Sequence, residues 1–466
     1  MTNSGGAITQ IGVTAAHDEH DQGWARILWT WRAPAVLFAV GLLLASVGLL
    51  WSWLVAPTAH PGWFVQNDLI KSSENAWWQG RTGGLTHLYS GNGALLEGLP
   101  GYQLWLVAVV LLGQHVGMPI PGEASSSHVV FGAVHPVGSI WYLVVPLALG
   151  AAFAALFPFD ALVRRIGIRG APRIVTLSVL TVLIGWSAAF WGHPEYAVAS
   201  GFLAGALLSA GSGQWRRAGW LLGFGIACQP VVLLTVPLLL LLARRDWLRT
   251  FVRACVPPLV VVFLPLVGDP GDTLRAIFVA TEDPRYGHHT PLLAVVPHPH
   301  LLAVSAGWPR TSALLVALGL AIPLARWVRS RVDLQALVWA TAAVLALRAV
   351  SEALFFPYYL TPFLVVALSI AFGHRWARAL GAVFWAAGLI VLVSSHVLGL
   401  WAYWSVLVAG EAGLLALTLP LPRADDRPGH PRTVPTTGVL TRASTDDPNH
   451  ATPPRLGTPP PEAVSR

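Results

Sequence analysis

Long apolar stretches recur from Pro34 to Leu421, and short polar clusters rich in arginine separate them. Each approaches the roughly 20 residues that an α-helix needs to cross a bilayer. With 55% apolar and only 11% charged residues, the chain carries more apolar surface than a soluble domain buries. We therefore predict an all-α, polytopic membrane bundle with about 11 to 13 spans. The expected spans lie near 34–56, 137–159, 173–191, 194–211, 251–267, 311–327, 334–355, 357–373, 380–399 and 401–420. Two further apolar stretches, 102–118 and 218–243, do not have a simple assignment.

The stretches 218–243 and 102–118 do not fit a simple series of spans. The first has arginines at both ends, so both ends belong on one side, and Cys228-Gln229-Pro230 interrupts it. Because proline removes a backbone donor and kinks a helix, we predict two short helices that meet near the outer side. If the second stretch, 102–118, crossed the membrane fully, the arginines at 164–173 would lie on the outer side, against the positive-inside rule. Either it is a partly inserted piece, or 119–136 hides another crossing.

The distribution of basic residues predicts which side of the membrane each loop faces. Clusters at 164–173, 216–217, 244–253, 326–331 and 375–378 belong in the cytoplasm by the positive-inside rule, together with both termini. All but six of the 29 Lys and Arg residues are placed there. Topology does not require the other six, so they are candidates for chemistry on the outer side. They are Lys71, Arg81, Arg275, Arg285, Arg310 and Arg348.

The chain is expected to divide into three parts. Residues 1–33 are a predicted cytoplasmic leader, and 34–421 form a transmembrane domain with long outer loops at 57–101 and 268–309. The tail 422–466 is rich in Pro, Thr, Asp and Arg, with almost no apolar clusters. It cannot bury enough surface to order itself, so we expect a disordered cytoplasmic tail. The predicted location is the plasma membrane.

The first outer loop contains a predicted interfacial helix between Asn67 and Gly80. Asp68 occupies its first turn, where the helix dipole favours the ionised form and suits a general base. Trp77 and Trp78 fit an interfacial belt or a platform on which a sugar stacks. The plain alternative is that acidic residues in a first turn and tryptophans at an interface are ordinary features.

The turn Trp191-Gly192-His193-Pro194-Glu195 joins two spans with almost no loop. It places His193 and Glu195 at the lip of the bundle, where they can meet a polar substrate. Alternatively, Gly-His-Pro simply makes the turn.

Arg348 and Glu352 lie one helical turn apart near the outer end of the span 334–355, so they share a face. An arginine inside a span is costly and requires a partner. That partner is either Glu352 or a lipid phosphate, which the guanidinium can bind through two hydrogen bonds. Aromatic residues, including Tyr358, follow at the outer interface.

The second outer loop is rich in histidine, at positions 288, 289, 298 and 300. Such residues can bind a metal, but their spacing matches no ligand signature, and a solvated loop is expected. Its cationic side chains can instead help to hold a phosphate or a glycan. The chain lacks a phosphate-binding P-loop, a Gly-x-Ser-x-Gly elbow and a zincin motif. No cytoplasmic loop is long enough for a nucleotide-binding domain, so an energy-rich substrate must enter from the membrane.

Four sequence elements follow one another in a recognisable order. They are Gln66-Asn67-Asp68-Leu69; Leu88-Tyr89 with Leu99-Pro100-Gly101-Tyr102; Gly192-His193-Pro194-Glu195 with Ala218-Gly219-Trp220-Leu221-Leu222-Gly223; and the segment from Glu352 to Pro362. In this order, the elements resemble the GT-C superfamily of membrane glycosyltransferases. Within it, they are most similar to the actinobacterial polyprenyl-phosphate-mannose-dependent α-mannosyltransferases, glycosyltransferase family eighty-seven, and the likeness covers about residues 35–420.

This resemblance implies inverting transfer of a sugar, mannose in the family, from polyprenyl phosphate to a lipid-linked or cell-envelope glycan on the outer face. Asp68 would be the base. It implies no metal, cofactor or nucleic acid, and its partners would be membrane lipids, the donor and the acceptor. The donor phosphate would be held by Arg348, Arg285, His288 and His289, and other substrate groups by Lys71, Trp77, His193, Glu195, Glu352 and Tyr358.

Two other readings stay open. A polytopic transporter or flippase for an isoprenoid-linked or polar solute would use the same groups for binding without chemistry. Transporters commonly repeat a broken helix pair, and the sequence suggests one such pair, at 218–243, without a counterpart. A degenerate GT-C protein with a scaffolding role is the third.

Overall fold

The structure is a computed structural model, and its backbone separates into two units, Met1–Pro420 and Leu421–Arg466. All of the described residues belong to the first unit, so the expected tail lies outside them. The described residues are 24–55, 69, 72, 86, 101–118, 141–271, 273–274, 288–289, 307–331, 333–351, 354–373, 376–394 and 398–420.

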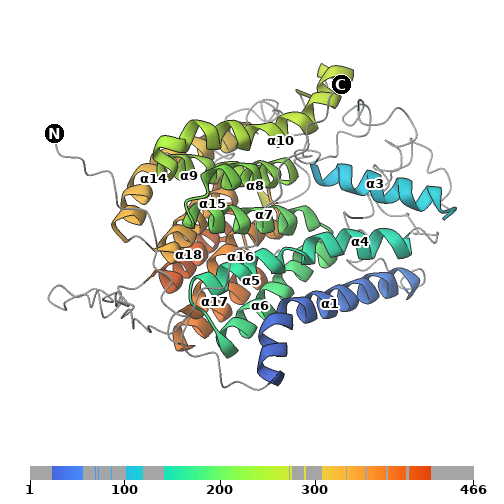
Figure 1. Ribbon diagram of the computed structural model, residues 1–466, viewed down its shortest axis with the longest axis horizontal. Helices are drawn as coiled ribbons and strands as arrows, with labels where there is room; N and C mark the ends of the chain where they lie inside the picture. Colours follow the sequence, from blue (N-terminus) through green and yellow to red (C-terminus); the bar gives the residue numbers. More distant parts are fainter. Residues whose placement is uncertain are drawn as a thin grey trace, which may run out of the picture. The chain divides into compact units, whose positions relative to one another are not determined.

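The described part of the first unit is a bundle of α-helices, as the sequence predicts (Figure 1). Two strands of two residues each, β1 (His288–His289) and β2 (Leu354–Phe355), pair antiparallel. The α-helices are α1 (Trp24–Val55), α3 (Gly101–His115), α4 (Trp141–Phe153), α5 (Leu156–Arg165), α6 (Gly170–Gly185), α7 (Pro194–Gly211), α8 (Trp215–Cys228), α9 (Val236–Ala243), α10 (Trp247–Gly268), α14 (Gly307–Arg331), α15 (Leu334–Ser351), α16 (Thr361–Leu368), α17 (Trp376–Ser394) and α18 (Leu400–Thr418). Shorter turns are η3 (Trp186–Phe190), η4 (Pro230–Thr235), η5 (Arg244–Asp246), η7 (Pro357–Leu360) and η8 (Ala371–Gly373).

Eight helical segments of the described chain are long and apolar enough to cross a membrane. The protein therefore has the make-up of a multi-pass membrane protein. The number is lower than the 11 to 13 expected, because α7 and α8 are not among the eight and 357–373 is shorter than a span. In addition, α9 and α10 fall within one continuous stretch. The eight are Arg32–Trp51, Tyr142–Arg165, Gly170–Phe190, Pro230–Gly268, Ser312–Arg331, Leu334–Ser351, Trp376–Ser394 and Trp401–Thr418.

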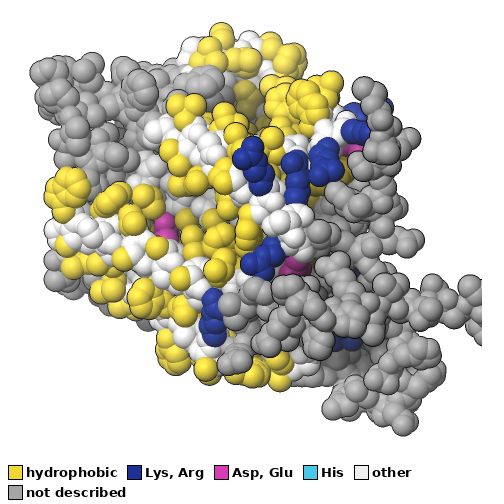
Figure 2. Space-filling model, turned by 90° about the vertical axis from the view of Figure 1, so that its left-hand side faces the viewer, with side chains coloured by type: hydrophobic (Ala, Val, Ile, Leu, Met, Phe, Trp, Pro, Cys, Tyr) yellow, Lys and Arg dark blue, Asp and Glu magenta, His cyan; other side chains and the backbone are white. Residues whose placement is uncertain are grey.

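Arginine side chains gather at one end of the bundle, on the face that Figure 2 shows. Contacts between helix ends hold this face together. Thr250, in the first turn of α10, donates a hydrogen bond from Oγ1 to Trp215 O at the start of α8. At the end of α7, Gly211 packs on Leu334 at the start of α15. We call this the arginine end. Its exposed members are Arg164, Arg165, Arg169, Arg216, Arg217, Arg244, Arg245, Arg249, Arg326 and Arg331.

The expected break at Cys228-Gln229-Pro230 is confirmed. Helix α8 ends at Cys228, Gln229 is extended with φ −153° and ψ 118°, and Pro230 begins η4. Proline fits the first helical position because that residue's N–H has no intrahelical partner. Helix α9 then runs to Ala243, so the chain returns to the arginine end in two short helical pieces.

A second interruption follows α15, where the sequence predicts a boundary between two separate spans. Phe356 is extended with φ −117° and ψ 141°, Pro357 begins η7, and α16 follows. Both α8 and α15 begin at the arginine end and break at the other end. The two broken pairs are therefore parallel, and η4 packs against α15.

Two glycines explain how closely α8 packs on α10. A Cβ atom at Gly219 would lie 2.6 Å from Thr250 O, and one at Gly223 would lie 2.8 Å from Ala254 O. Small residues four apart let helix backbones approach, as in other membrane bundles. The Ala-Gly-x-x-x-Gly segment therefore has a packing role.

Candidate functional site

The turn between α6 and α7 is fixed by an unusual local backbone. The last turn of α6 widens into the π-helix η3, a geometry that is frequent at functional sites. Gly192 then adopts φ +78°, which glycine tolerates at no steric cost. The backbone N–H of His193 donates to Ser187 O at 2.9 Å, and Ser187 Oγ donates to His193 O at 3.1 Å. His193 is therefore held rigidly just before the first residue of α7.

His193 and Glu195, which the sequence placed at the lip of the bundle, are in direct contact. His193 Nδ1 lies 2.7 Å from Glu195 Oε1, and the two side chains are only 11% and 17% exposed. An ionised carboxylate can only accept a hydrogen bond, so Nδ1–H of His193 donates to an ionised Glu195. In the neutral ring with its proton on Nδ1, Nε2 is a hydrogen-bond acceptor.

Tyr358, the third predicted substrate-binding residue in this region, stacks on His193. The two ring centroids are 3.7 Å apart with an interplanar angle of 23°. The Phe356 ring also stacks on Tyr358, with centroids 5.4 Å apart and an interplanar angle of 10°. The break before η7 thus carries Tyr358 to the start of α7. We call Trp191, His193, Tyr196, Phe356, Tyr358 and Tyr359 the aromatic cluster.

Arg348 joins this cluster through Tyr359. Its guanidinium carbon lies 4.5 Å from the centroid of the Tyr359 ring, within cation–π distance. The Tyr359 ring meets Tyr358 edge to face, with centroids 4.9 Å apart. Glu352, the expected structural partner of Arg348, lies outside the described residues. The structure therefore links Arg348, Tyr358, His193 and Glu195, four of the predicted site residues, through contacts in one region.

Trp191 adds a hydrogen-bond donor that sequence reasoning missed. Its ring centroid lies 5.7 Å from that of Tyr358, and its indole N–H is buried without a hydrogen-bond partner among the described residues. Burying a donor unpaired is costly, so such groups are rare. A tryptophan at the end of a span otherwise indicates only an interface, and no sequence pattern distinguishes the two roles.

Helix α3 connects the cluster with the first loop. Tyr102 Oη donates to Ala148 O at 3.2 Å. Burial raises the pKa of this hydroxyl, which lies outside the eight apolar segments, and the nearby Glu195 carboxylate adds to the increase. The next residue, Gln103, donates from Nε2 to Ser72 O at 2.8 Å, and Leu69 is fully buried in the core. Asp68, Lys71 and Trp77 lie outside the described residues, and their roles stay predictions.

The pairing of β1 with β2 brings part of the second loop to the same region. His288 is opposite Phe355 and His289 is opposite Leu354, a few residues after Arg348 in the chain. Arg285 lies outside the described residues. Within the described ranges, no group of three or more His, Cys, Asp or Glu residues is arranged to hold a metal ion.

No protein-family model matches this sequence, and no curated protein does. The function is therefore argued from the residues and their geometry.

Proposed function

We propose that the protein is a polyprenyl-phosphate-sugar-dependent glycosyltransferase, with mannose as the sugar that the sequence resemblance suggests. The observation that carries the proposal is the contact network that links Glu195, His193, Tyr358, Tyr359 and Arg348. It combines a carboxylate–imidazole pair for hydroxyl groups, aromatic faces for a sugar, and an arginine for a phosphate.

The position of the network supports a membrane-borne donor. Helix α7 begins at the network and ends at the arginine end, so its 18 residues separate the two by roughly 27 Å. This is close to the thickness of a bilayer's hydrocarbon core, about 30 Å. In our proposal the arginine end faces the cytoplasm and the network faces the outer side of the plasma membrane.

The proposed reaction is a single inverting displacement. An acceptor hydroxyl oxygen of a lipid-linked or cell-envelope glycan attacks the anomeric carbon and forms the new glycosidic bond. The bond from that carbon to the phosphate oxygen breaks, and polyprenyl phosphate leaves with the electron pair. Asp68 takes the hydroxyl proton. Because the leaving phosphate is already anionic, the site must supply position and charge stabilisation more than an acid.

Each side chain of the network has a distinct task in this scheme. Arg348 binds the donor phosphate, aided by Arg285, His288 and His289 from the second loop. Nε2 of His193 accepts a hydrogen bond from a sugar hydroxyl, while Glu195 fixes the tautomer and orientation of the ring. Lys71, Trp77 and Glu352 complete the substrate site in the proposal.

The test is sugar transfer in proteoliposomes that contain the full chain, radiolabelled polyprenyl-phosphate mannose and a membrane-lipid extract as acceptor. We expect transfer by wild type, its loss in Asp68→Ala, and a strong reduction in Arg348→Gln. Matched controls are Asp246→Ala and Arg326→Gln, which change the same residue types at the arginine end. Transfer that persists in a folded Asp68→Ala removes Asp68 as the base. If the folded wild-type protein transfers no sugar from any polyprenyl-phosphate donor, the glycosyltransferase proposal is contradicted.

One observation favours the transporter or flippase as a second candidate. The structure has two parallel broken helix pairs, α8–η4–α9 and α15–η7–α16, and parallel repeats occur in transporter folds. The same proteoliposomes distinguish the two functions. A transporter moves labelled polyprenyl-phosphate sugar between leaflets and leaves the sugar attached to its carrier, whereas the enzyme produces a glycosylated acceptor.

A further inference from the structure

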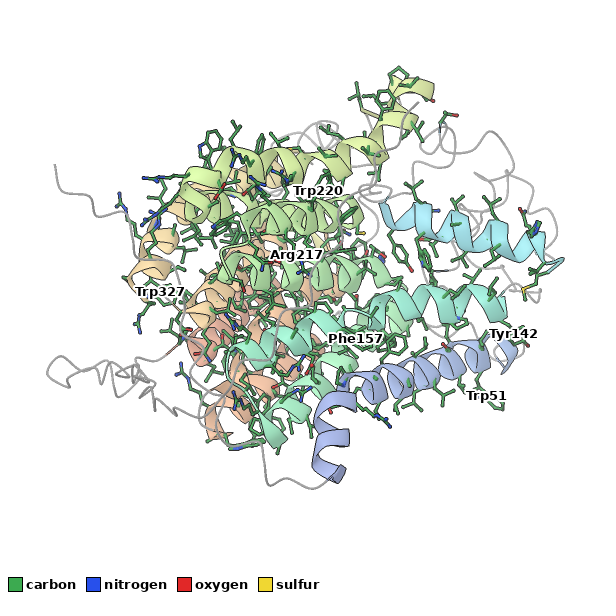
Figure 3. The ribbon with its side chains drawn as sticks, viewed as in Figure 1. Trp51, Tyr142, Phe157, Arg217, Trp220 and Trp327 are labelled. Carbon is green, nitrogen blue, oxygen red and sulfur yellow. The ribbon has the colours of Figure 1, made fainter. Side chains whose placement is uncertain are left out.

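A groove of about 550 Å³ lies between α5, α7 and α8, on the part of the bundle near the arginine end. It follows α7 from Val198 to Ser212, which is roughly 20 Å at the rise of an α-helix. One wall is Ala154, Ala155 and other small residues around the start of α5. Arg217 of α8, labelled in Figure 3, also lines the groove.

Two glycines of α7 give the groove its shape. A Cβ atom at Gly201 would lie 2.8 Å from Ala155 Cβ, and one at Gly205 would lie 3.3 Å from Leu221 Cδ1. These glycines are therefore already used to pack α7 against its neighbours within the molecule. The remaining space is a narrow apolar channel, which suits a flexible hydrocarbon chain better than a helix about 10–12 Å wide.

The end of the groove near Arg217 is polar. Ser209, Ser212 and Gln214 line it together with the Arg217 guanidinium. Arg217 takes part in none of the ion pairs among the described residues. Gln214 precedes α8 and makes no side-chain cap, so the positive end of the 14-residue helix dipole adds to the arginine charge. This combination favours an anionic group.

We propose that the groove binds one anionic phospholipid, with its phosphate at Arg217 and the start of α8 and one acyl chain along α7. The length fits, because one leaflet contributes roughly 15 Å of hydrocarbon and the headgroup lies beyond it. The phosphate end of the site is separate from the aromatic cluster, because the 17 helical steps from Glu195 to Ser212 span about 25 Å, whereas the apolar end near Val198 lies about one turn from Glu195. The proposal does not depend on the glycosyltransferase function.

The test is native mass spectrometry of the full chain in detergent, titrated with phosphatidylglycerol or with phosphatidylcholine of the same acyl chains. We expect wild type to bind one phosphatidylglycerol more tightly than phosphatidylcholine. Arg217→Gln should weaken phosphatidylglycerol binding about tenfold, the loss expected for one charge-assisted hydrogen bond. Arg216→Gln is the matched control, because Arg216 is exposed on the same helix but does not line the groove.

A second pair of variants tests the apolar part. Ala154→Phe fills the groove and should remove the binding of both lipids, whereas Ala377→Phe, at an exposed alanine of α17, should not. A photoactivatable phosphatidylglycerol needs no substitution and should label peptides from 151–161 or 198–221. Equal weakening by Arg217→Gln and Arg216→Gln, full binding by Ala154→Phe, or labelling confined to other helices would each overturn the proposal. A dimer that Ala154→Phe dissociates would assign the groove to a second copy instead.

Discussion

The guanidinium of Arg173 donates two hydrogen bonds to the carboxylate of Asp160, from Nε to Oδ1 at 2.6 Å and from Nη2 to Oδ2 at 3.0 Å. Both side chains are about 5% exposed or less. Arg164 reaches the same carboxylate at 3.2 Å. Sequence reasoning counted Arg173 among the cytoplasmic charges that set topology, but the structure buries it as the link between α5 and α6.

This buried pair makes Asp160 a stability determinant. Asp160→Asn should lower the free energy of unfolding by about 3–5 kcal/mol, because it leaves the Arg173 charge buried without a counterion. Asp246→Asn is the control: its pair with Arg249 is exposed, and such pairs contribute about 0–1 kcal/mol. Unfolding of both variants in mixed micelles measures the difference. Equal stability of the two variants would contradict a structural role for the buried pair.

The seam between α8 and α10 should not accept a side chain at Gly223. A Cβ atom there meets Ala254 O and Pro257 Cδ, at 2.8 and 2.7 Å, so Gly223→Ala should cost roughly 1–3 kcal/mol of stability. Gly319→Ala on α14 is the control, since nothing lies within 4 Å of its Cβ position. The control should be neutral or up to about 1 kcal/mol more stable, because alanine favours helix. Thermal unfolding of both variants decides the matter.

In the glycosyltransferase proposal, Glu195 positions His193 for a substrate hydroxyl. Glu195→Gln should therefore reduce transfer efficiency about 10- to 100-fold, the cost of a lost charged hydrogen bond. Glu195→Asp, which keeps the charge but shortens the side chain, should retain part of it. Initial rates across donor concentrations give the measurement. Unchanged transfer by Glu195→Gln would show that the pair only stabilises the turn.

Trp191→Phe removes the unpaired indole N–H and keeps an aromatic ring. Removing the unpaired N–H relieves a burial cost of about 1–3 kcal/mol and offsets the packing lost with the smaller ring, so stability of the unliganded protein should not fall by more than about 1 kcal/mol. If the N–H binds substrate, KM for the donor or acceptor should rise about 2- to 10-fold with little change in kcat. A large loss of stability with unchanged KM would assign Trp191 a structural role instead.

Much of the helical bundle follows from the hydropathy pattern, and Gln229-Pro230 marks a break because proline lacks the donor that α-helix requires. The second break, at Phe356-Pro357, lies between two spans already predicted as separate, so no local pattern indicates that it resembles the first. The burial of Arg173 depends on where Asp160 lies across the α5–α6 junction, a tertiary relationship that local composition does not carry.

In the candidate site, too, local sequence patterns predict contacts between near neighbours in the chain but not contacts between distant segments. Gly192-His193-Pro194 predicts a tight turn, and the Glu195 contact follows from its short separation. The stacking of His193 on Tyr358 joins segments far apart in the chain, and neither spacing nor charge predicts it. The same is true of the Trp191 N–H, which finds no hydrogen-bond partner among the described residues.

The stacking of His193 between α7 and η7 also has a consequence for biogenesis. A ribosome adds about 5–20 residues per second, so Tyr358 emerges on the order of ten seconds after His193. During that interval the nascent membrane chain contains His193 and Glu195 but not the Tyr358 ring that stacks on His193. A product truncated before η7 keeps most of the described helices but lacks the Tyr358 ring that stacks on His193, so it leaves the His193–Glu195 pair less covered.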